Sequence, residues 1–146
     1  MKILAIHGAN LPLLGKVSSG NKSKLTLDKV DKFLKNEAKS VACELKIHQL
    51  YDESKIIRYI SSNRNQVDGI LLSIGAMSRN FYTLKELLQI IEIPVAEIFL
   101  SEYPCSKDNH QKSVLTKVAK VRIFDQGIDA YKNGLHQLIS LIKDSR

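Results

Sequence analysis

Near its N-terminus the chain has an apolar run that leads directly into a loop containing glycine, asparagine and proline, and this transition limits the possible folds more than any other feature. Residues 3–6 are Ile-Leu-Ala-Ile, without the alternation of a half-exposed strand, which is typical of a strand covered on both faces. Gly8 and Asn10 follow, and both residue types tolerate the backbone angles of a sharp turn. Because open α/β sheets bind small molecules at the carboxyl ends of their strands, Asn10 is a candidate binding residue as well as a possible turn cap.

Length and composition fit one domain spanning residues 1–146. With 44% apolar and 25% charged residues, the chain can bury a core without disulfides or a structural metal. The first apolar run is too short for a signal peptide or a membrane span, so we expect a cytoplasmic protein with no membrane partner. Cys43 and Cys105 lack CxxC spacing and are expected to stay reduced, and no metal site is predicted.

The net charge of +7, from 22 Lys and Arg against 15 Asp and Glu, favours an anionic partner. Lysines are spread through the first loop and the helix expected after it, without an aromatic platform or a dense arginine stripe. We therefore expect a small anionic ligand and not a nucleic acid.

Hydrophobic spacing predicts alternating strands and helices. Strands are expected at residues 3–7, 44–48, 67–72, 95–100 and 118–124. Helices are expected at residues 27–41, 52–60, 81–91 and 128–142, and a polar loop at 101–112. Five strands joined by helices predict an α/β, flavodoxin-like three-layer sandwich with a five-stranded parallel sheet. Its loops at residues 8–16, 73–79 and 101–110 are expected to meet at one pocket, and they lack the glycine-rich signatures of nucleotide sites.

The four histidines and the tyrosines have structural interpretations beside the functional ones. His7 is expected to be a hydrogen-bonded turn residue, and His48 and His136 to lie on solvated faces. His110 is the histidine expected in a wall of the pocket. Tyr103 is a possible acid or base, although packing with its hydroxyl in water is the commoner role of such a tyrosine.

Several short motifs, in order along the chain, resemble those of the type II 3-dehydroquinate dehydratases. They are Gly-Ala-Asn-Leu-x-Leu-Leu-Gly-Lys at 8–16, Leu-Thr-Leu at 25–27, Ile-Gly-Ala at 74–76, Glu-Ile-x-Leu-Ser at 97–101, Ser at 113 and Val-Ala at 118–119. The resemblance covers nearly the whole chain. It implies a trimer or a trimer-built dodecamer, no cofactor, and a lyase of the shikimate or quinate pathway that dehydrates 3-dehydroquinate through an enolate.

The resemblance also implies where the catalytic groups belong. The family's base, a lid-loop Tyr assisted by an Arg, corresponds to Lys22 and Val17. Its general acid, a His oriented by a Glu, corresponds to Phe99, while the Glu is present as Glu97. Asn10, which would place a water at the enolate, and Lys22 are the candidate catalytic residues.

The substrate-binding positions are partly retained. The family's residue stands at Gly75, Leu100 and Ser101. A different residue type stands at Ser73, Arg79, Glu86 and His110. All seven are candidate binding residues, and Glu86 replaces an Asp that would reach into a neighbouring subunit's site.

Losing a general acid or base typically costs about a hundred- to ten-thousandfold in rate. We therefore predict a degenerate site with weak or no dehydratase activity that still binds a small oxyanion or polyhydroxy carboxylate. Two alternatives stay open. One is an active dehydratase with reassigned residues, such as Lys22, Asn10 and His110. The other is a non-catalytic, oligomeric binding or scaffold protein.

Overall fold

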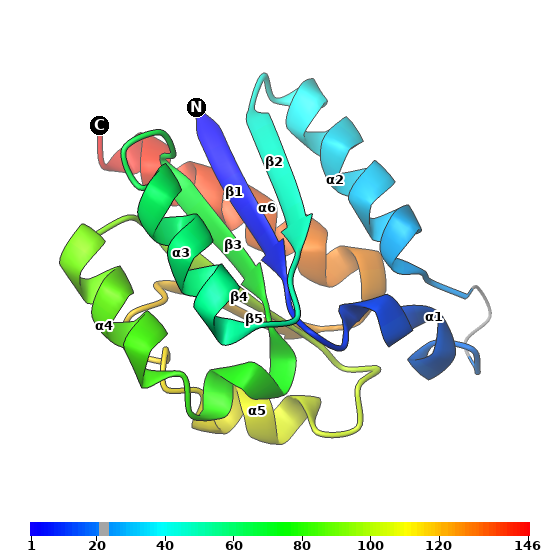
Figure 1. Cartoon of the computed structure of the whole chain (residues 1–146). Helices are drawn as coiled ribbons and strands as arrows, with labels where there is room; N and C mark the ends of the chain where they lie inside the picture. The colour runs from blue at the N-terminus through cyan, green and yellow to red at the C-terminus, as the bar shows by residue number, and fades with distance from the viewer. Residues whose placement is uncertain (21–23) are drawn as a thin grey trace.

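A parallel sheet between two helical layers forms the molecule in the computed structural model, which describes residues 1–20 and 24–146 (Figure 1). Its five strands are β1 (Lys2–His7), β2 (Glu44–Gln49), β3 (Gly69–Ser73), β4 (Val95–Leu100) and β5 (Val121–Asp125). They are ordered β2-β1-β3-β4-β5, and every pairing is parallel. This is the flavodoxin-like order, so the predicted fold class is confirmed.

The helices divide between the two faces of the sheet. They are α1 (Leu14–Val17), α2 (Leu27–Ser40), α3 (Glu53–Asn63), α4 (Tyr82–Ile91), α5 (Ser106–Lys112) and α6 (Gly127–Asp144), with short 3-10 turns η1 (Leu11–Leu13) and η2 (Gly75–Arg79). Helices α2 and α6 pack on one face, and α3 and α4 on the other. Helix α5 lies beside η2 at the carboxyl end of the sheet (Figure 1).

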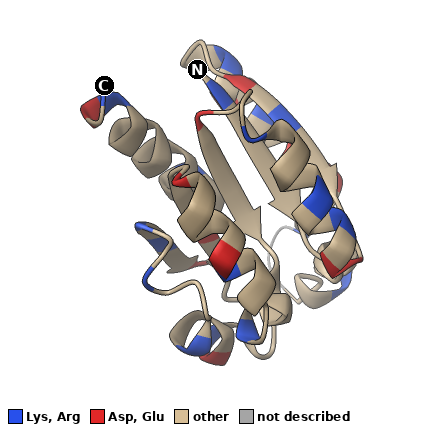
Figure 2. Ribbon diagram, turned by 60° about the vertical axis from the view of Figure 1, so that its left-hand side comes forward, with Lys and Arg blue, Asp and Glu red and all other residues tan. Residues whose placement is uncertain are grey.

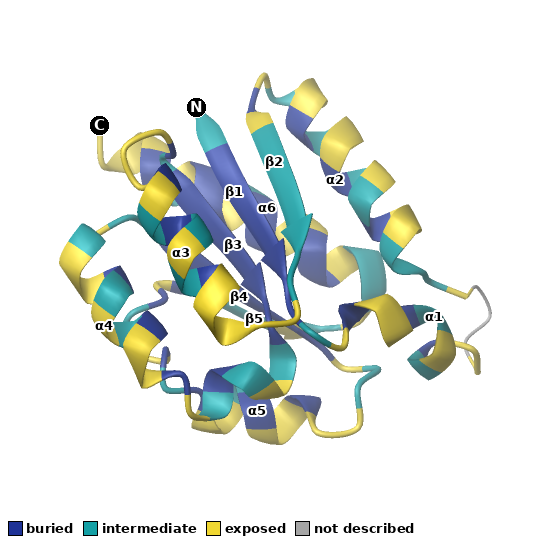
Figure 3. Cartoon of the chain, viewed as in Figure 1, coloured by how far each residue is buried: buried dark blue, intermediate teal, exposed yellow. Residues whose placement is uncertain are grey.

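The central strands are buried on both faces, as their apolar sequences predict (Figure 3). Along β1, Ile3 and Ala5 join the core under α2 and α6, whereas Leu4 and Ile6 join the core under α3 and α4. Gly134 lets α6 approach the sheet closely, since a Cβ at this position would overlap the side chain of Ile98. Strands β1 and β3 therefore present alternate residues to two separate cores.

Side chains cap the N-termini of two helices. Thr26 begins α2, and its side chain accepts a hydrogen bond from the Lys29 N–H at 3.3 Å. Asp52 begins α3 and accepts from the N–H groups of Ser54 and Lys55. Both caps satisfy donors that the first turn of a helix leaves unpaired.

Three expectations about secondary structure are wrong. Residues 101–112 are not a continuous loop, because they contain helix α5. This helix has no apolar spacing, and its buried face is formed by the polar residues Ser106 and Asn109. The last strand begins at Val121 and not at 118, since the preceding residues form a turn in which the Ala119 N–H donates to the Leu115 carbonyl at 2.9 Å. The alternation of polar and apolar residues at 44–48 predicts an edge strand with one solvated face. Strand β2 is instead half-buried along most of its length, because helices flank it on both faces.

The charges are dispersed over the molecule. Figure 2 shows Lys and Arg on several elements without one continuous stripe. His136, expected at the surface, is partly exposed and pairs with Glu37 of α2 at 2.9 Å. His48 of β2 packs against the Tyr59 ring, with 4.3 Å between ring centroids. Among the described residues, no helix is long and apolar enough to cross a bilayer.

Candidate functional site

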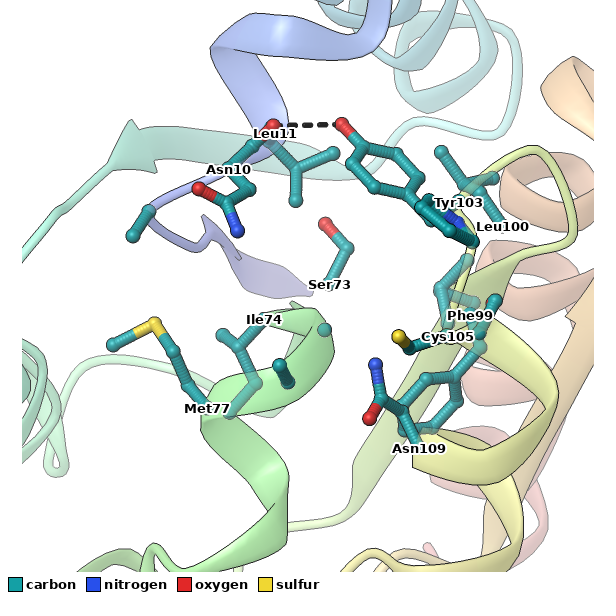
Figure 4. Close-up of a pocket in the computed structure, with 16 residues that line it drawn as sticks. Asn10, Leu11, Ser73, Ile74, Met77, Phe99, Leu100, Tyr103, Cys105 and Asn109 are labelled. Carbon is teal, nitrogen blue, oxygen red and sulfur yellow. Dashed lines mark hydrogen bonds between the residues drawn. The ribbon is translucent and has the colours of Figure 1, made fainter. Parts of the chain in front are cut away.

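A cavity of about 170 Å³ opens at the carboxyl ends of β1, β3 and β4 (Figure 4). Its lining consists of residues 9–11, 73–77, 98–100, 103–106 and 109. The loops that follow three different strands therefore meet at one pocket, as the sequence predicts. The cavity lies where the strand order reverses around β1 and β3, which is the usual place of a ligand in this fold.

The polar part of the lining is uncharged. Among the described lining residues, those with polar side chains are Asn10, Ser73, Tyr103, Cys105, Ser106 and Asn109. The remainder is mainly apolar. Ligand recognition in this cavity would therefore depend on amide and hydroxyl groups at fixed places in an apolar wall.

Tyr103 joins two loops of the pocket. Its hydroxyl donates to the Asn10 carbonyl oxygen at 2.8 Å, the contact drawn in Figure 4. Burial, reinforced by the charge of Glu102, raises the pKa of Tyr103 to about 12. The phenol therefore stays protonated near neutral pH, and its hydroxyl is bonded to the backbone of another pocket loop.

Asn109 turns its amide toward the cavity. Arg79 Nη1 donates to Asn109 Oδ1 at 3.4 Å, which directs the carboxamide nitrogen of Asn109 away from the arginine. In Figure 4 the amide nitrogen of Asn109 points into the pocket, and so does the amide nitrogen of Asn10. Arg79 itself supports the wall from behind and does not line the cavity.

Phe99 fills the β4 side of the site. Its side chain is buried and packs edge-on against the His110 ring, with 5.5 Å between centroids. The Arg122 guanidinium lies 5.9 Å from the centre of the Phe99 ring. Burial, with a smaller effect from the Arg122 charge, lowers the pKa of His110. His110 faces aromatic rings and is not part of the cavity lining.

Behind Phe99 lies a sealed group that we call the Glu97 cluster, formed by Glu97, Arg122 and Ser113. The Glu97 carboxylate, 1% exposed, accepts from Ser113 Oγ at 2.6 Å and from Arg122 Nε at 2.9 Å. Arg122 also donates to the His110 carbonyl. The carboxylate is thus fully engaged within the protein.

A second buried group, the His7 cluster, consists of His7, Ser73 and Asp31. His7 and Ser73 are paired residues at the ends of β1 and β3, so their side chains lie on the same face of the sheet. His7 Nδ1 is 2.6 Å from Ser73 Oγ, and His7 Nε2 is 2.9 Å from Asp31 Oδ1 of α2. The expectation that His7 is hydrogen-bonded is confirmed, and Ser73 links the cluster to the cavity.

The structure gathers only some of the candidate residues around the cavity. Those that line it are Asn10, Ser73, Gly75, Phe99 and Leu100. Those that lie outside the lining are Arg79, Glu86, Ser101 and His110. Glu86 is exposed on α4, and the Ser101 N–H donates to the Asp125 carbonyl at 2.9 Å. Lys22 falls outside the described residues.

Sequence reasoning missed two polar lining residues, Ser106 and Asn109. Both lie on the one-sided, polar helix α5, where apolar periodicity gives no signal. Their spacing of three places them on the same helix face, which is the signal that could have identified them.

The cysteines and the metal-ligating residue types form no further centre in the described part of the chain. Cys43 and Cys105 are free thiols, and burial raises the pKa of Cys43. Cys105 is exposed at the rim of the cavity. The described residues contain no group of three or more His, Cys, Asp or Glu side chains placed to hold a metal ion.

Known proteins share this sequence pattern and this fold. The family model for class II dehydroquinases matches residues 1–139. A 3-dehydroquinate dehydratase of Trichodesmium erythraeum is 30% identical over 142 residues, which cover 97% of this chain and 95% of that protein. A type II dehydroquinase of Butyrivibrio crossotus superposes with a TM-score of 0.84 and 26% identity, covering 95% of this chain and 97% of the other. A 3-dehydroquinate dehydratase-like protein of Bifidobacterium longum, 19% identical with a TM-score of 0.71 and 98% of both chains covered, shares the fold.

Proposed function

Because the chain belongs to the class II dehydroquinase family, we propose that it is a dehydratase-like protein with weak or no ability to convert 3-dehydroquinate to 3-dehydroshikimate. In this proposal the pocket at the strand ends binds a small polyhydroxy carboxylate or another small oxyanion. The protein would act in the cytoplasm without a cofactor.

The observation that carries the proposal is Phe99. Dehydration through an enolate needs a base, a group that stabilises the enolate oxygen, and an acid that protonates the departing hydroxyl. The sequence resemblance puts Phe99 at the position of the family's acid, and its buried ring cannot donate a proton. The ring also occupies cavity wall that an acid would need, and the carboxylate of Glu97, which would orient that acid, is engaged by Arg122 and Ser113.

None of the residues considered above as acids, bases or reassigned groups supplies a replacement for the family's base in the described part of the chain. The phenol of Tyr103, with a pKa of about 12, is a poor base near neutral pH. His110 faces Phe99 and Phe124, and Lys22 lies outside the described residues. An active enzyme with Lys22, Asn10 and His110 as reassigned groups therefore receives less support.

The ligand class follows from the polar atoms of the cavity. Amides of Asn10 and Asn109 and the hydroxyl of Ser106 suit a compound with several hydroxyl groups. A carboxylate would be attracted by Arg79, which lies directly behind Asn109. The net charge of +7 adds a general attraction for anions.

A direct ultraviolet assay for the conjugated product of 3-dehydroquinate tests the loss of activity. At high protein concentration we expect turnover at least about a hundredfold below the 1–10³ s⁻¹ of ordinary enzymes. Turnover within that ordinary range would overturn the proposal.

Binding is tested separately by thermal unfolding with quinate, citrate or sulfate. At least one should raise the Tm of the wild type, and Asn109→Ala should reduce the shift. Asn36→Ala, at an exposed position on α2, is the matched control that should keep it. A shift that survives Asn109→Ala would place the ligand elsewhere.

A homo-oligomer, either a trimer or a dodecamer, is also part of the proposal. Helix α4 exposes Tyr82 and Ile90, 63% and 70% accessible in the single chain, which supports contact with another subunit. Light scattering during size-exclusion chromatography should report a trimer or a multiple of it. A monomer at micromolar concentration would contradict the proposed oligomer but not the proposed loss of dehydratase activity. Assembly without binding of any of the three ligands would favour a scaffold protein.

A further inference from the structure

The His7 cluster holds a serine, a histidine and a carboxylate in one hydrogen-bonded chain, and dehydration of 3-dehydroquinate makes no use of it. Sheet register brings Ser73 and His7 together, and Asp31 reaches them from the helix that covers this face. A nucleophile bonded to a base that is itself oriented by a third group is the arrangement that activates serine in hydrolases of unrelated folds.

The burial of the three residues differs in a way that suits catalysis. His7 is 0% exposed, and the Tyr131 ring packs edge-on against it with 5.7 Å between centroids. Ser73 is also buried from bulk solvent, but it lines the cavity, and Figure 4 shows its side chain at the centre of the pocket. A molecule in the cavity would therefore meet the serine while the imidazole stays behind it.

The partners of His7 fix which ring nitrogen carries the proton. The Asp31 carboxylate can only accept a hydrogen bond, so Nε2 is the nitrogen that donates. Whenever the ring is neutral, Nδ1 is then the nitrogen that accepts from the Ser73 hydroxyl, whose oxygen lies 2.6 Å away. The serine proton thus already points at the base that would remove it.

We propose that Ser73 is a nucleophile activated by His7 and Asp31, and that the pocket hydrolyses small, uncharged carboxylic esters. The cavity of about 170 Å³ admits only a small acyl group, and its described lining is apolar or neutral. Amide nitrogens of Asn10 and Asn109 point into the same space and can donate to an oxyanion that forms there.

The reaction would run in two balanced halves. Ser73 Oγ attacks the ester carbonyl carbon, its proton passes to His7 Nδ1, and the bond to the alcohol oxygen breaks as the alcohol leaves with that proton. Water then gives a proton to His7 and attacks the acylated serine. The carboxylic acid leaves, and Ser73 Oγ recovers the proton.

This inference goes beyond the proposed function and fails separately from it. It depends on Ser73 and His7, whereas the loss of dehydration depends on Phe99 and is measured with 3-dehydroquinate. Ester hydrolysis could be absent while the 3-dehydroquinate assay still shows no turnover. Ester hydrolysis could also be present in a protein that does turn over 3-dehydroquinate.

The test uses an alkyl fluorophosphonate on the full-length protein, with mass spectrometry of the intact chain and of its peptides. We expect one adduct per chain, on Ser73, formed with loss of fluoride, and a burst of one p-nitrophenol per chain from p-nitrophenyl acetate. Ser73→Ala should abolish both. Ser78→Ala is the matched control, because this buried serine of the same loop donates to the Gly75 carbonyl at 2.8 Å and lies outside the cavity lining.

Two variants test the activating groups. His7→Asn should slow labelling at least about a hundredfold. Asp31→Asn should also slow it, because an amide that donates to Nε2 leaves the proton on Nδ1, and Asp31 is accessible enough for this variant to fold even if His7→Asn does not. No adduct on Ser73, an adduct elsewhere, or unchanged labelling of folded Asp31→Asn would each overturn the proposal.

Discussion

The two buried polar clusters stand at neighbouring strand ends, yet they have opposite relations to the cavity. The His7 cluster lies on the face covered by α2 and α6 and exposes Ser73 to the pocket. The Glu97 cluster lies on the other face, because Glu97 alternates with Ala96 and Ile98 of the α6 core, and none of its described members lines the pocket.

The difference teaches that burial and hydrogen bonding do not by themselves make a catalytic group. In the Glu97 cluster every strong partner of the carboxylate belongs to the protein, and Phe99 stands between the cluster and the cavity. In the His7 cluster one end of the chain of hydrogen bonds is a hydroxyl that a ligand can reach. The first arrangement stabilises the fold, and the second can also act on a ligand.

The largest expected effect on stability comes from breaking the Glu97 cluster. Arg122→Met should lower the free energy of unfolding by about 3–5 kcal/mol, because it leaves the buried Glu97 carboxylate without its cation. Urea unfolding measures this loss. The double variant with Glu97→Gln should recover much of it, and a single variant as stable as wild type would show that the pair is not buried in solution.

Breaking the His7 cluster should lower the stability of the protein less. Asp31→Ala should lower the free energy of unfolding by about 1–2 kcal/mol, because the Asp31 side chain is 29% exposed and water can replace part of its bond to His7. The same urea experiment gives the comparison, with Lys35→Ala on the exposed side of α2 as a control expected to stay within about 0.5 kcal/mol of wild type. A loss as large as that of Arg122→Met would remove the distinction between the clusters.

The parts of the molecule that sequence predicts are those built by local apolar patterns. The runs that become β1, β3 and β4 are long enough to identify buried strands, and their order fixes the parallel sheet. Helix α5 was missed because polar residues alone form its buried face.

The candidate site was harder to predict because its contacts join distant residues. Asn10 and Ser73 follow strands directly, so the sequence places them near the pocket. Asp31 gives no such signal, since it reaches His7 across 24 positions of sequence through the packing of α2 on the sheet. Tyr103 likewise acquires its pKa of about 12 from tertiary burial.

A substitution of Tyr131, beside the His7 cluster, should change stability by a smaller amount and in the opposite direction. The Tyr131 hydroxyl is fully buried beside the His7 cluster and makes no well-formed hydrogen bond among the described residues, with Ser73 as the polar side chain in its reach. Tyr131→Phe therefore removes a desolvated polar group while keeping the ring. We expect a gain of about 1 kcal/mol in the free energy of unfolding, measured by urea titration. Fluorophosphonate labelling of Ser73 should persist, and a loss of both stability and labelling would instead make Tyr131 a structural member of the cluster.

The smallest effect is a pH dependence at the border of the Glu97 cluster. Burial and Arg122 lower the pKa of His110 in the folded protein, so the unfolded chain, with a histidine pKa of about 6.5, takes up the proton first as pH falls. The stability that neutral His110 contributes is therefore complete above about pH 6.5 and declines below it, until the folded pKa is passed.

His110→Asn should be less stable than wild type at every pH, because it loses the contacts with Phe99 and Phe124, but its urea midpoint should fall less between about pH 7.5 and about pH 5.5. Some slope should remain, because burial and Lys46 also lower the pKa of His48. An unchanged slope in His110→Asn would mean that the His110 ring is hydrated in solution. The aromatic wall that separates the Glu97 cluster from the cavity would then be open, and the contrast with the His7 cluster would lose its physical basis.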